Sequence, residues 1–383
     1  MSTAAIRSLA LSLILISLVS LLALGGCGTV GTKVCNLNSG CCGPTSDACA
    51  VPQFLYANGL NGQISVFPIG NDGGVAGSSS SVSAPANSLG MAALNNQFLY
   101  ASNPASPVGG TSSIEAWSIN PSTGALTALP GSPFSLGPLS FAAGLAMNNA
   151  AQVLYVADAG KIDALHADAT GALTPIVGSP FPGGGTLYLT VDPLNRFVFA
   201  SDDAPPGSVV TFTINSTGAL AAVPGSPFAT IPGYVGTTRP TQIVTDATGS
   251  FVYTGLLATG QVAGFSINAA SGALTLVPGS PFPAGNNPIS LATINNFLFV
   301  SNFTDGTISG YSINPSNGAL TALAGSPFAI HGGPLVASPF GGFLYTTGPG
   351  GLLALSVNPQ TGALTQVGSA IPYGGATVLT VVP

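Results

Sequence analysis

The chain has 383 residues, of which 46% are hydrophobic and only 4% are charged, and its formal net charge is −6. This composition excludes a disordered chain, which would combine low hydrophobicity with high charge. It also excludes a nucleic-acid binder, because phosphate neutralisation needs a basic stripe. After residue 26 only four scattered residues are basic, Lys33, Lys161, Arg196 and Arg239. The 52 glycines and 32 prolines instead favour many short strands joined by tight turns.

Residues 1–26 have the pattern of an export signal. Arg7 supplies a short basic region, and the apolar run over 9–24 is too short for a comfortable membrane span. The Leu-Gly-Gly-Cys sequence at 24–27 resembles the bacterial lipobox, in which the cysteine sulfur accepts a diacylglycerol. We therefore expect a lipoprotein signal peptide over 1–26 and membrane attachment through a lipid on Cys27. An uncleaved anchor and an ordinary signal peptide are the alternatives. The resemblance implies an exported protein at the cell envelope, and Gly28 implies the outer membrane where the cell has two.

Residues 27–52 form a cysteine-rich stalk in this interpretation. Four cysteines follow the lipidation site: Cys35, Cys41, Cys42 and Cys49. An even number in a short exported stretch predicts two disulfides. Adjacent cysteines have poor geometry for pairing, so 35–41 with 42–49 and 35–42 with 41–49 both stay open. A four-thiolate zinc site is the alternative, but the oxidising compartment and the missing CxxC spacing disfavour it. We predict no metal and no cofactor.

Seven copies of one aromatic-rich strand follow along the rest of the chain. Their first residues are Phe54, Phe98, Val153, Phe197, Phe251, Phe297 and Phe343. The copies are spaced 44 to 55 residues apart. A period of this length, made of short strands, is typical of four-stranded propeller blades. The sequence therefore predicts an all-β protein whose residues 53–383 form one seven-bladed β-propeller.

Each repeat continues in a regular order. An alternating strand is followed by a turn that ends in Thr-Gly-Ala-Leu, as at 170–173 and 217–220, where the glycine suits a positive φ. A short outer strand then reaches Gly-Ser-Pro-Phe, as at 178–181. Proline cannot donate to a ladder, so it fits the end of an edge strand, and the phenylalanine can plug the space between blades.

The last strand of each unit is small and apolar, and we place it innermost, at the crowded axis. The chain starts its first blade at the second strand, near Phe54, and ends on an innermost-type strand over 377–382. The C-terminal strand is therefore expected to complete blade one, which removes the open edges of the ring.

These motifs resemble the lactonase family of seven-bladed propellers, which includes 6-phosphogluconolactonase-like enzymes and fungal muconate-lactonising enzymes and borders on YVTN-type surface propellers. The repeated FLYxSN strand, the SINPxTGALT turn and the GSPF corner carry the resemblance over 54–383. It implies ligand binding at the channel mouth, where the muconate enzymes use charged side chains. The motifs themselves are turns and packing corners, so they predict the fold and not an activity.

Strand order predicts which face holds a site. Loops between the second and third strands and between blades share one face, and they hold most of the ionisable residues. The ligand-binding candidates are Asp158, Lys161, Asp202, Asp203, Arg239, Asp305 and His331. His331 is the candidate general base or water-positioning group, and Arg239 the candidate for stabilising an oxyanion. For each of them a turn or a solvated loop is the plain alternative.

Three functions fit this sequence. The first is a ligand-binding or scaffold module at the cell envelope, expected to be monomeric. The second is a lactonase that hydrolyses a cyclic ester. The third is a carbohydrate-binding propeller. Convergence of Arg239, His331 and an aspartate on one pocket would favour the enzyme.

Overall fold

The computed structural model describes residues 52–104, 111–138, 140–158 and 160–382. The signal peptide, the lipid site Cys27 and the cysteines of the stalk lie outside the described residues, so the expectations about them remain predictions. Within the described ranges there is no helix of a length and apolarity that would cross a membrane.

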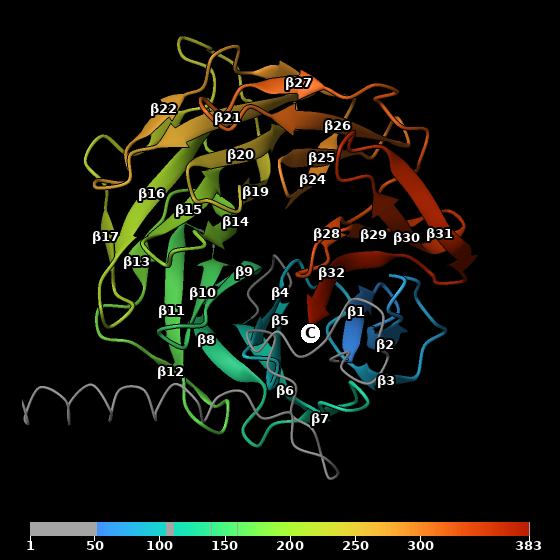
Figure 1. Ribbon diagram of the computed structural model, residues 1–383. Coiled ribbons are helices and arrows are strands. Elements are labelled where there is room, and N and C mark those ends of the chain that lie inside the picture. The colour runs from blue at the N-terminus through green and yellow to red at the C-terminus, as the bar shows by residue number, and fades with distance from the viewer. Residues whose placement is uncertain (1–51, 105–110, 139, 159, 383) are drawn as a thin grey trace, which may run out of the picture. The chain divides into compact units, whose positions relative to one another are not determined.

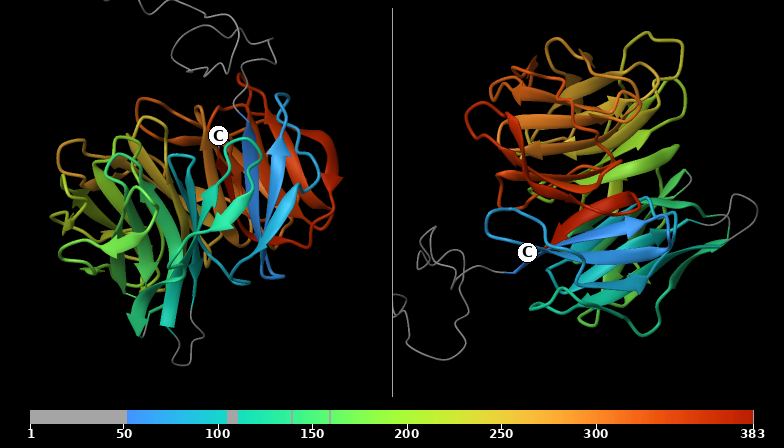
Figure 2. Two further views of the ribbon diagram at one scale, coloured as in Figure 1. Left: turned by 90° about the horizontal axis from the view of Figure 1, so that it is seen from below. Right: turned by 90° about the vertical axis from the view of Figure 1, so that its right-hand side faces the viewer.

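The described chain is a ring of seven antiparallel sheets around a central channel (Figure 1). The prediction of an all-β, seven-bladed propeller with four-stranded blades is confirmed. Figure 2 shows the ring from the side, with the strands running between its two faces.

The strands of the first four blades, from channel to rim, occupy the following ranges. Blade 1 contains β32 (Ala376–Val382), β1 (Gln53–Gly59), β2 (Gln63–Ile69) and β3 (Ser80–Ser83). Blade 2 contains β4 (Met91–Leu94), β5 (Phe98–Asn103), β6 (Thr111–Ile119), β7 (Leu126–Ala128) and β8 (Phe134–Pro138). Blade 3 contains β9 (Ala142–Asn148), β10 (Val153–Asp158), β11 (Lys161–Ala167), β12 (Leu173–Pro175) and β13 (Phe181–Pro182). Blade 4 contains β14 (Thr186–Val191), β15 (Phe197–Asp202), β16 (Ser208–Ile214), β17 (Leu220–Ala222) and β18 (Phe228–Ala229).

The remaining three blades repeat this order. Blade 5 contains β19 (Pro240–Thr245), β20 (Phe251–Leu256), β21 (Gln261–Ile267), β22 (Leu274–Leu276) and β23 (Phe282–Pro283). Blade 6 contains β24 (Pro288–Ile294), β25 (Phe297–Asn302), β26 (Thr307–Ile313) and β27 (Leu320–Ala322). Blade 7 contains β28 (Val336–Ala337), β29 (Phe343–Gly348), β30 (Gly351–Val357) and β31 (Leu364–Ile371).

The C-terminal strand closes the ring as expected. β32 pairs antiparallel with β1, and Phe54 lies opposite Val382. In Figure 1 the red β32 and the blue β1 lie side by side in one sheet. Blade 1 is therefore built from both ends of the described chain, which leaves no unpaired inner edge between blades 1 and 7.

The outermost strand of four blades is split by the Gly-Ser-Pro-Phe corner. In blade 3, β12 and β13 both pair with β11, and the corner lies between them. The Ser179 hydroxyl accepts a hydrogen bond from the Ala164 amide at 2.9 Å, so it takes over a bond that the ladder would otherwise make. Phe181 then packs against the apolar cluster between blades 3 and 4, as predicted for this phenylalanine.

The core lies in the seven seams between neighbouring blades. Each apolar cluster joins residues of two adjacent blades; Tyr155 of blade 3, for example, packs with Val198 and Phe212 of blade 4. The Tyr155 hydroxyl also donates to the Gly218 carbonyl of blade 4 at 2.8 Å. Burial raises the pKa of this tyrosine, so the hydroxyl remains a proton donor.

This tie between blades recurs around the ring. Four further tyrosines at the same strand position donate to a turn glycine of the next blade: Tyr56 to Gly124, Tyr100 to Gly171, Tyr253 to Gly318 and Tyr345 to Gly73. Phe199 of blade 4 and Phe299 of blade 6 stand where the other blades have tyrosine. We call the end of the ring that carries these glycine turns the turn face, and the opposite end the loop face.

Candidate functional site

All seven ligand-binding candidates lie at the loop face. Asp158 and Lys161 flank the β10–β11 connection, and Asp202 ends β15. Asp203 follows Asp202, Arg239 precedes β19, Asp305 lies between β25 and β26, and His331 precedes β28. The antiparallel order of each blade brings these connections to the same face, but the residues are spread over blades 3 to 7.

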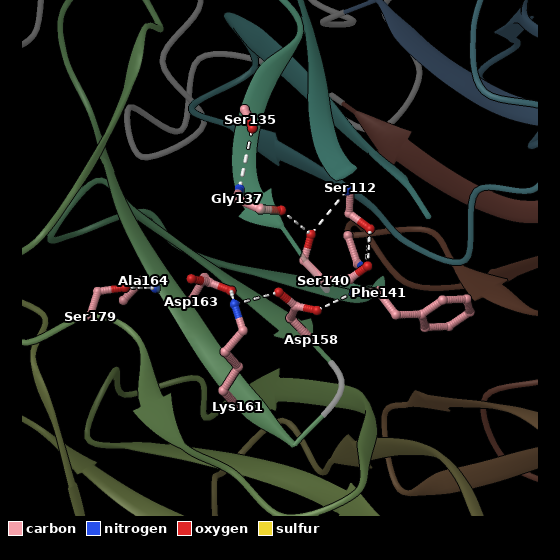
Figure 3. Close-up of polar contacts among 11 residues, drawn as sticks. Ser112, Ser135, Gly137, Ser140, Phe141, Asp158, Lys161, Asp163, Ala164 and Ser179 are labelled. Atoms are coloured by element: carbon pink, nitrogen blue, oxygen red, sulfur yellow. Dashed lines mark hydrogen bonds and ion pairs between the residues drawn. The ribbon is translucent and has the colours of Figure 1, made fainter. Parts of the chain in front are cut away.

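Asp158, Lys161 and Asp163 form one buried ion cluster on blade 3, beside blade 2 (Figure 3). The Lys161 Nζ lies 2.7 Å from Asp158 Oδ2 and 3.2 Å from Asp163 Oδ2. Burial raises the pKa of Asp163 to about 6, helped by its hydrogen bond to Asp158 and opposed by Lys161. The charge of Lys161 is thus already shared between two carboxylates of its own blade, so this cluster offers no unpaired cation to a ligand.

The other oxygen of Asp158 belongs to a repeated loop-holding contact. It accepts a hydrogen bond from the Phe141 amide, in the connection that enters blade 3. Asp202 accepts from the Gly185 amide at 2.7 Å in blade 4, and Asn302 accepts from the Gly285 amide at 3.0 Å in blade 6. Because an asparagine performs the same task, the two aspartates at this position act as loop anchors and need no ligand to explain them.

Asp203, Asp305 and Arg239 do not form a common site either. Asp305 is exposed, and its carboxylate accepts hydrogen bonds from the Asn286 amide at 2.7 Å and from the Asn286 side chain at 2.8 Å. These bonds lower the pKa of Asp305. Asp203 is half-buried beside the anchored loop of Gly185. Arg239 is exposed at a positive φ of 49°, and its carbonyl accepts from the Leu257 amide at 3.1 Å.

His331 lines a cleft over blade 7 that has a volume of about 450 Å³. Its walls include Leu60 of blade 1, Phe303 of blade 6, and Tyr373 in the connection that enters blade 1. The Tyr373 hydroxyl donates to the Ala57 carbonyl at 2.9 Å, so the phenol is fixed in the wall. The cleft has no Asp, Glu, Lys or Arg among its lining residues, and Arg239 is therefore not part of it.

The cleft lies over the short hairpin loop of blade 7. β29 and β30 are joined through Gly-Pro-Gly-Gly at 348–351, whereas the neighbouring loops present Leu60 and Phe303. These two side chains are 63% and 50% exposed, respectively. Two large apolar side chains thus flank a low floor, which is the usual form of a small-molecule site.

Beneath the cleft, the channel is lined mainly by apolar side chains of the innermost strands. Gln242 of blade 5 is a polar exception, and its Oε1 accepts from the Leu291 amide at 3.0 Å and from the Ser290 hydroxyl. Ser290 in turn accepts from the Leu335 amide at 2.8 Å. This chain of hydrogen bonds links the innermost parts of blades 5, 6 and 7, so most of its polar atoms already have partners within the ring. In the described part of the chain, no three His, Cys, Asp or Glu side chains lie close enough to hold a metal ion.

The comparisons with known proteins agree with this architecture. Residues 207–334, from the start of blade 4's third strand to the wall of the cleft, match the family model for the lactonase 7-bladed beta-propeller. The resemblance to the lactonase family is confirmed. No curated protein matches the chain at a significant level.

Solved structures of similar shape support the same fold for this propeller. A candidate 6-phosphogluconolactonase from Bacteroides uniformis is 18% identical with a TM-score of 0.72, covering 86% of this chain and 99% of its own. The periplasmic gluconolactonase PpgL of Pseudomonas aeruginosa is 19% identical with a TM-score of 0.69, covering 87% of this chain and 99% of its own. At such identities the likeness shows a shared fold.

Sequence reasoning named His331 as a candidate but did not name its aromatic neighbours in the cleft. Phe303 and Tyr373 were not predicted, because single aromatics in loops do not stand out among 19 phenylalanines and 9 tyrosines. One usable signal was the Gly-Pro-Gly-Gly loop of blade 7, where the neighbouring blades 6 and 1 carry Phe303 and Leu60.

Proposed function

We propose that this protein is an exported, lipid-anchored propeller that binds a small, uncharged, ring-shaped ligand in the cleft at His331. The observation that carries the proposal is the lining of the cleft. His331, Phe303 and Tyr373 line it, and among the described residues no Asp, Glu, Lys or Arg does. An apolar wall with a few polar groups suits a neutral ring. A phosphorylated ligand would instead need Arg or Lys around its phosphate.

A lactone or a sugar ring has this chemistry. The family-model match includes His331, and the periplasmic gluconolactonase of similar fold is an exported protein named for an unphosphorylated lactone. The likenesses include both phosphorylated and unphosphorylated lactones, so the preference for an unphosphorylated aldonolactone rests on the lining of the cleft. Our first candidate function is binding of the ligand without turnover, as in a carbohydrate-binding or scaffold module.

Hydrolysis of the bound lactone is the second candidate, and the position of His331 in the cleft favours it. Arg239 does not line the cleft, so the pair of His331 and Arg239 does not support an oxyanion-stabilising role for that arginine. An enzyme at this site would therefore depend on His331 and not on that arginine.

The experiment is a calorimetric titration of the full-length protein in detergent with glucono-1,5-lactone and with its 6-phosphate, beside a pH-stat assay of both. We expect the unphosphorylated lactone to bind, His331→Ala to weaken binding at least about tenfold, and Arg239→Ala to leave it unchanged. His166→Ala is the matched control, because His166 is exposed on β11 away from the cleft. Preferential binding of the 6-phosphate, or binding that depends on Arg239, would overturn the proposal.

The lipid anchor needs its own test. Cys27→Ser is expected to abolish incorporation of a labelled fatty acid and to move the protein from the membrane fraction to the soluble one. Retention of the label in this variant would show that the lipid is elsewhere.

A further inference from the structure

The imidazole ring of His331 packs against the β25–β26 connection of blade 6. A Cβ at Gly306 would lie 3.0 Å from His331 Cδ2. The Phe303 ring packs edge-on against the imidazole, with centroids 5.9 Å apart and an angle of 76° between the planes. On blade 7, a Cβ at Gly348 would lie 3.3 Å from His331 Cβ, so that loop packs against the base of the side chain.

The two nitrogens differ in burial. Nδ1 is buried and has no hydrogen-bond partner among the described residues. Nε2 does not belong to the buried atoms that lack a hydrogen-bond partner, and His331 lines the cleft. We therefore take Nε2 as the nitrogen that faces the cleft. Ligand or water can reach only this side of the ring.

This asymmetry selects the position of the proton. A proton on Nδ1 would be a buried N–H donor without an acceptor, which folded proteins avoid more strictly than an unpaired acceptor. A proton on Nε2 can be donated to water or ligand in the cleft.

A general base of the usual kind also has a different arrangement. In such a site Nδ1–H donates to a carboxylate or carbonyl, which orients the ring and stabilises it when Nε2 takes up a proton. The described neighbours of His331 supply no such acceptor to Nδ1.

We infer that His331 is the neutral tautomer that carries its proton on Nε2, and that it recognises the ligand as a hydrogen-bond donor instead of removing a proton from it. The role in recognition rests on the proposed function, whereas the tautomer does not. The ligand must then present an acceptor oxygen to His331, such as a ring ether, a hydroxyl or a lactone carbonyl. For a lactone, this donor would polarise the carbonyl oxygen.

The tautomer can be read without any ligand. The chain has two histidines, so long-range ¹H–¹⁵N spectra of histidine-labelled full-length protein contain two imidazoles, and His166→Asn assigns them. We expect the His331 pattern of an Nε2–H tautomer at pH 7. A pattern with the proton on Nδ1, or a doubly protonated ring, would overturn the inference.

The recognition role is tested by two amides that imitate the two nitrogens. His331→Gln places an N–H near the position of Nε2, whereas His331→Asn can imitate only Nδ1. In the titration with glucono-1,5-lactone we expect Gln to keep the affinity within about threefold and Asn to lose about tenfold. Equal losses in the two variants would contradict a donor role. A wild-type protein that does not bind the lactone, with the Nε2–H pattern intact, would refute the proposed function and leave the tautomer standing.

Discussion

The turn face and the loop face are made by the same seven blades, yet neighbouring blades interact differently at the two ends. On the turn face a glycine of each blade packs against the start of the second strand in the preceding blade. Gly218 lies against Val153, and Gly171 lies against Phe98. On the loop face the aspartate anchors recur in only some blades, and the ion cluster of Lys161 and the cleft at His331 each occur beside one blade.

The difference teaches where a site in such a ring should be sought. Contacts on the turn face join adjacent blades, so a change there disturbs a seam on which closure depends. A loop-face connection can change its length and residues without moving the strands beneath it. The cleft accordingly lies where blade 7 departs most from its neighbours.

The largest expected effect comes from adding one methyl group to the turn face. In Gly218→Ala the new Cβ would lie 2.6 Å from Val153 Cγ2, at a φ of 82° that disfavours any side chain. We expect a loss of about 3 kcal/mol, combining left-handed strain with overpacking. Gly233→Ala on the loop face is the control, because it has a φ of 76° and nothing within 4 Å of the new Cβ. It should cost only about 1 kcal/mol. Equal shifts in the thermal midpoints would erase the contrast between the faces.

One aspartate on each face should also change the stability of the fold with pH, and the two changes should have opposite signs. The raised pKa of Asp163, about 6, means that the folded state binds this proton more tightly than the unfolded state does. Asp163 therefore costs stability as the pH rises from about 4 to 6. Asp163→Asn should become more stable relative to wild type over that range.

On the turn face, hydrogen bonds from Thr170 lower the pKa of Asp168. Asp168 thus stabilises the fold above the unfolded-state pKa, and this contribution is lost as the pH falls. Thermal midpoints followed from about pH 2 to pH 7 should show the Asp168→Asn difference changing in the reverse direction, and only below about pH 4. Parallel curves for the two variants would refute this assignment.

A smaller effect is expected at the tyrosine ties. Tyr155→Phe removes the hydroxyl that donates to the Gly218 carbonyl and should cost about 1 kcal/mol. The reverse substitution, Phe199→Tyr, supplies a hydroxyl at the seam where blade 4 lacks one. We expect it to gain less than Tyr155→Phe loses, because the added hydroxyl must also be removed from water. Denaturant unfolding measures both, and a neutral Tyr155→Phe would show that the apolar contacts alone hold the seam.

Much of the scaffold was predictable because its signals are local and repeated. Each signal predicts its element within a few residues: the aromatic runs predict strands, the turn glycines predict turns, and the Gly-Ser-Pro-Phe corners predict the ends of edge strands. The closing role of 377–382 followed from counting innermost strands. The ion cluster could not be predicted in the same way: Asp163 looked like an ordinary strand residue, and only the pairing of β10 with β11 brings it and Asp158 to the same lysine.

The sequence by itself determined the ring, the number of blades and the face on which ionisable residues gather, because repeat length, alternation and strand order are properties of the chain taken in order. Only the tertiary structure decided which of those residues are used in contacts within the fold and which one lines the cleft. Asp158 and Asp202 anchor loops, Lys161 is shared by two carboxylates, and His331 alone among the candidates lines the cleft with Phe303 and Tyr373. These outcomes depend on distances between loops of different blades, and closure of the ring sets those distances.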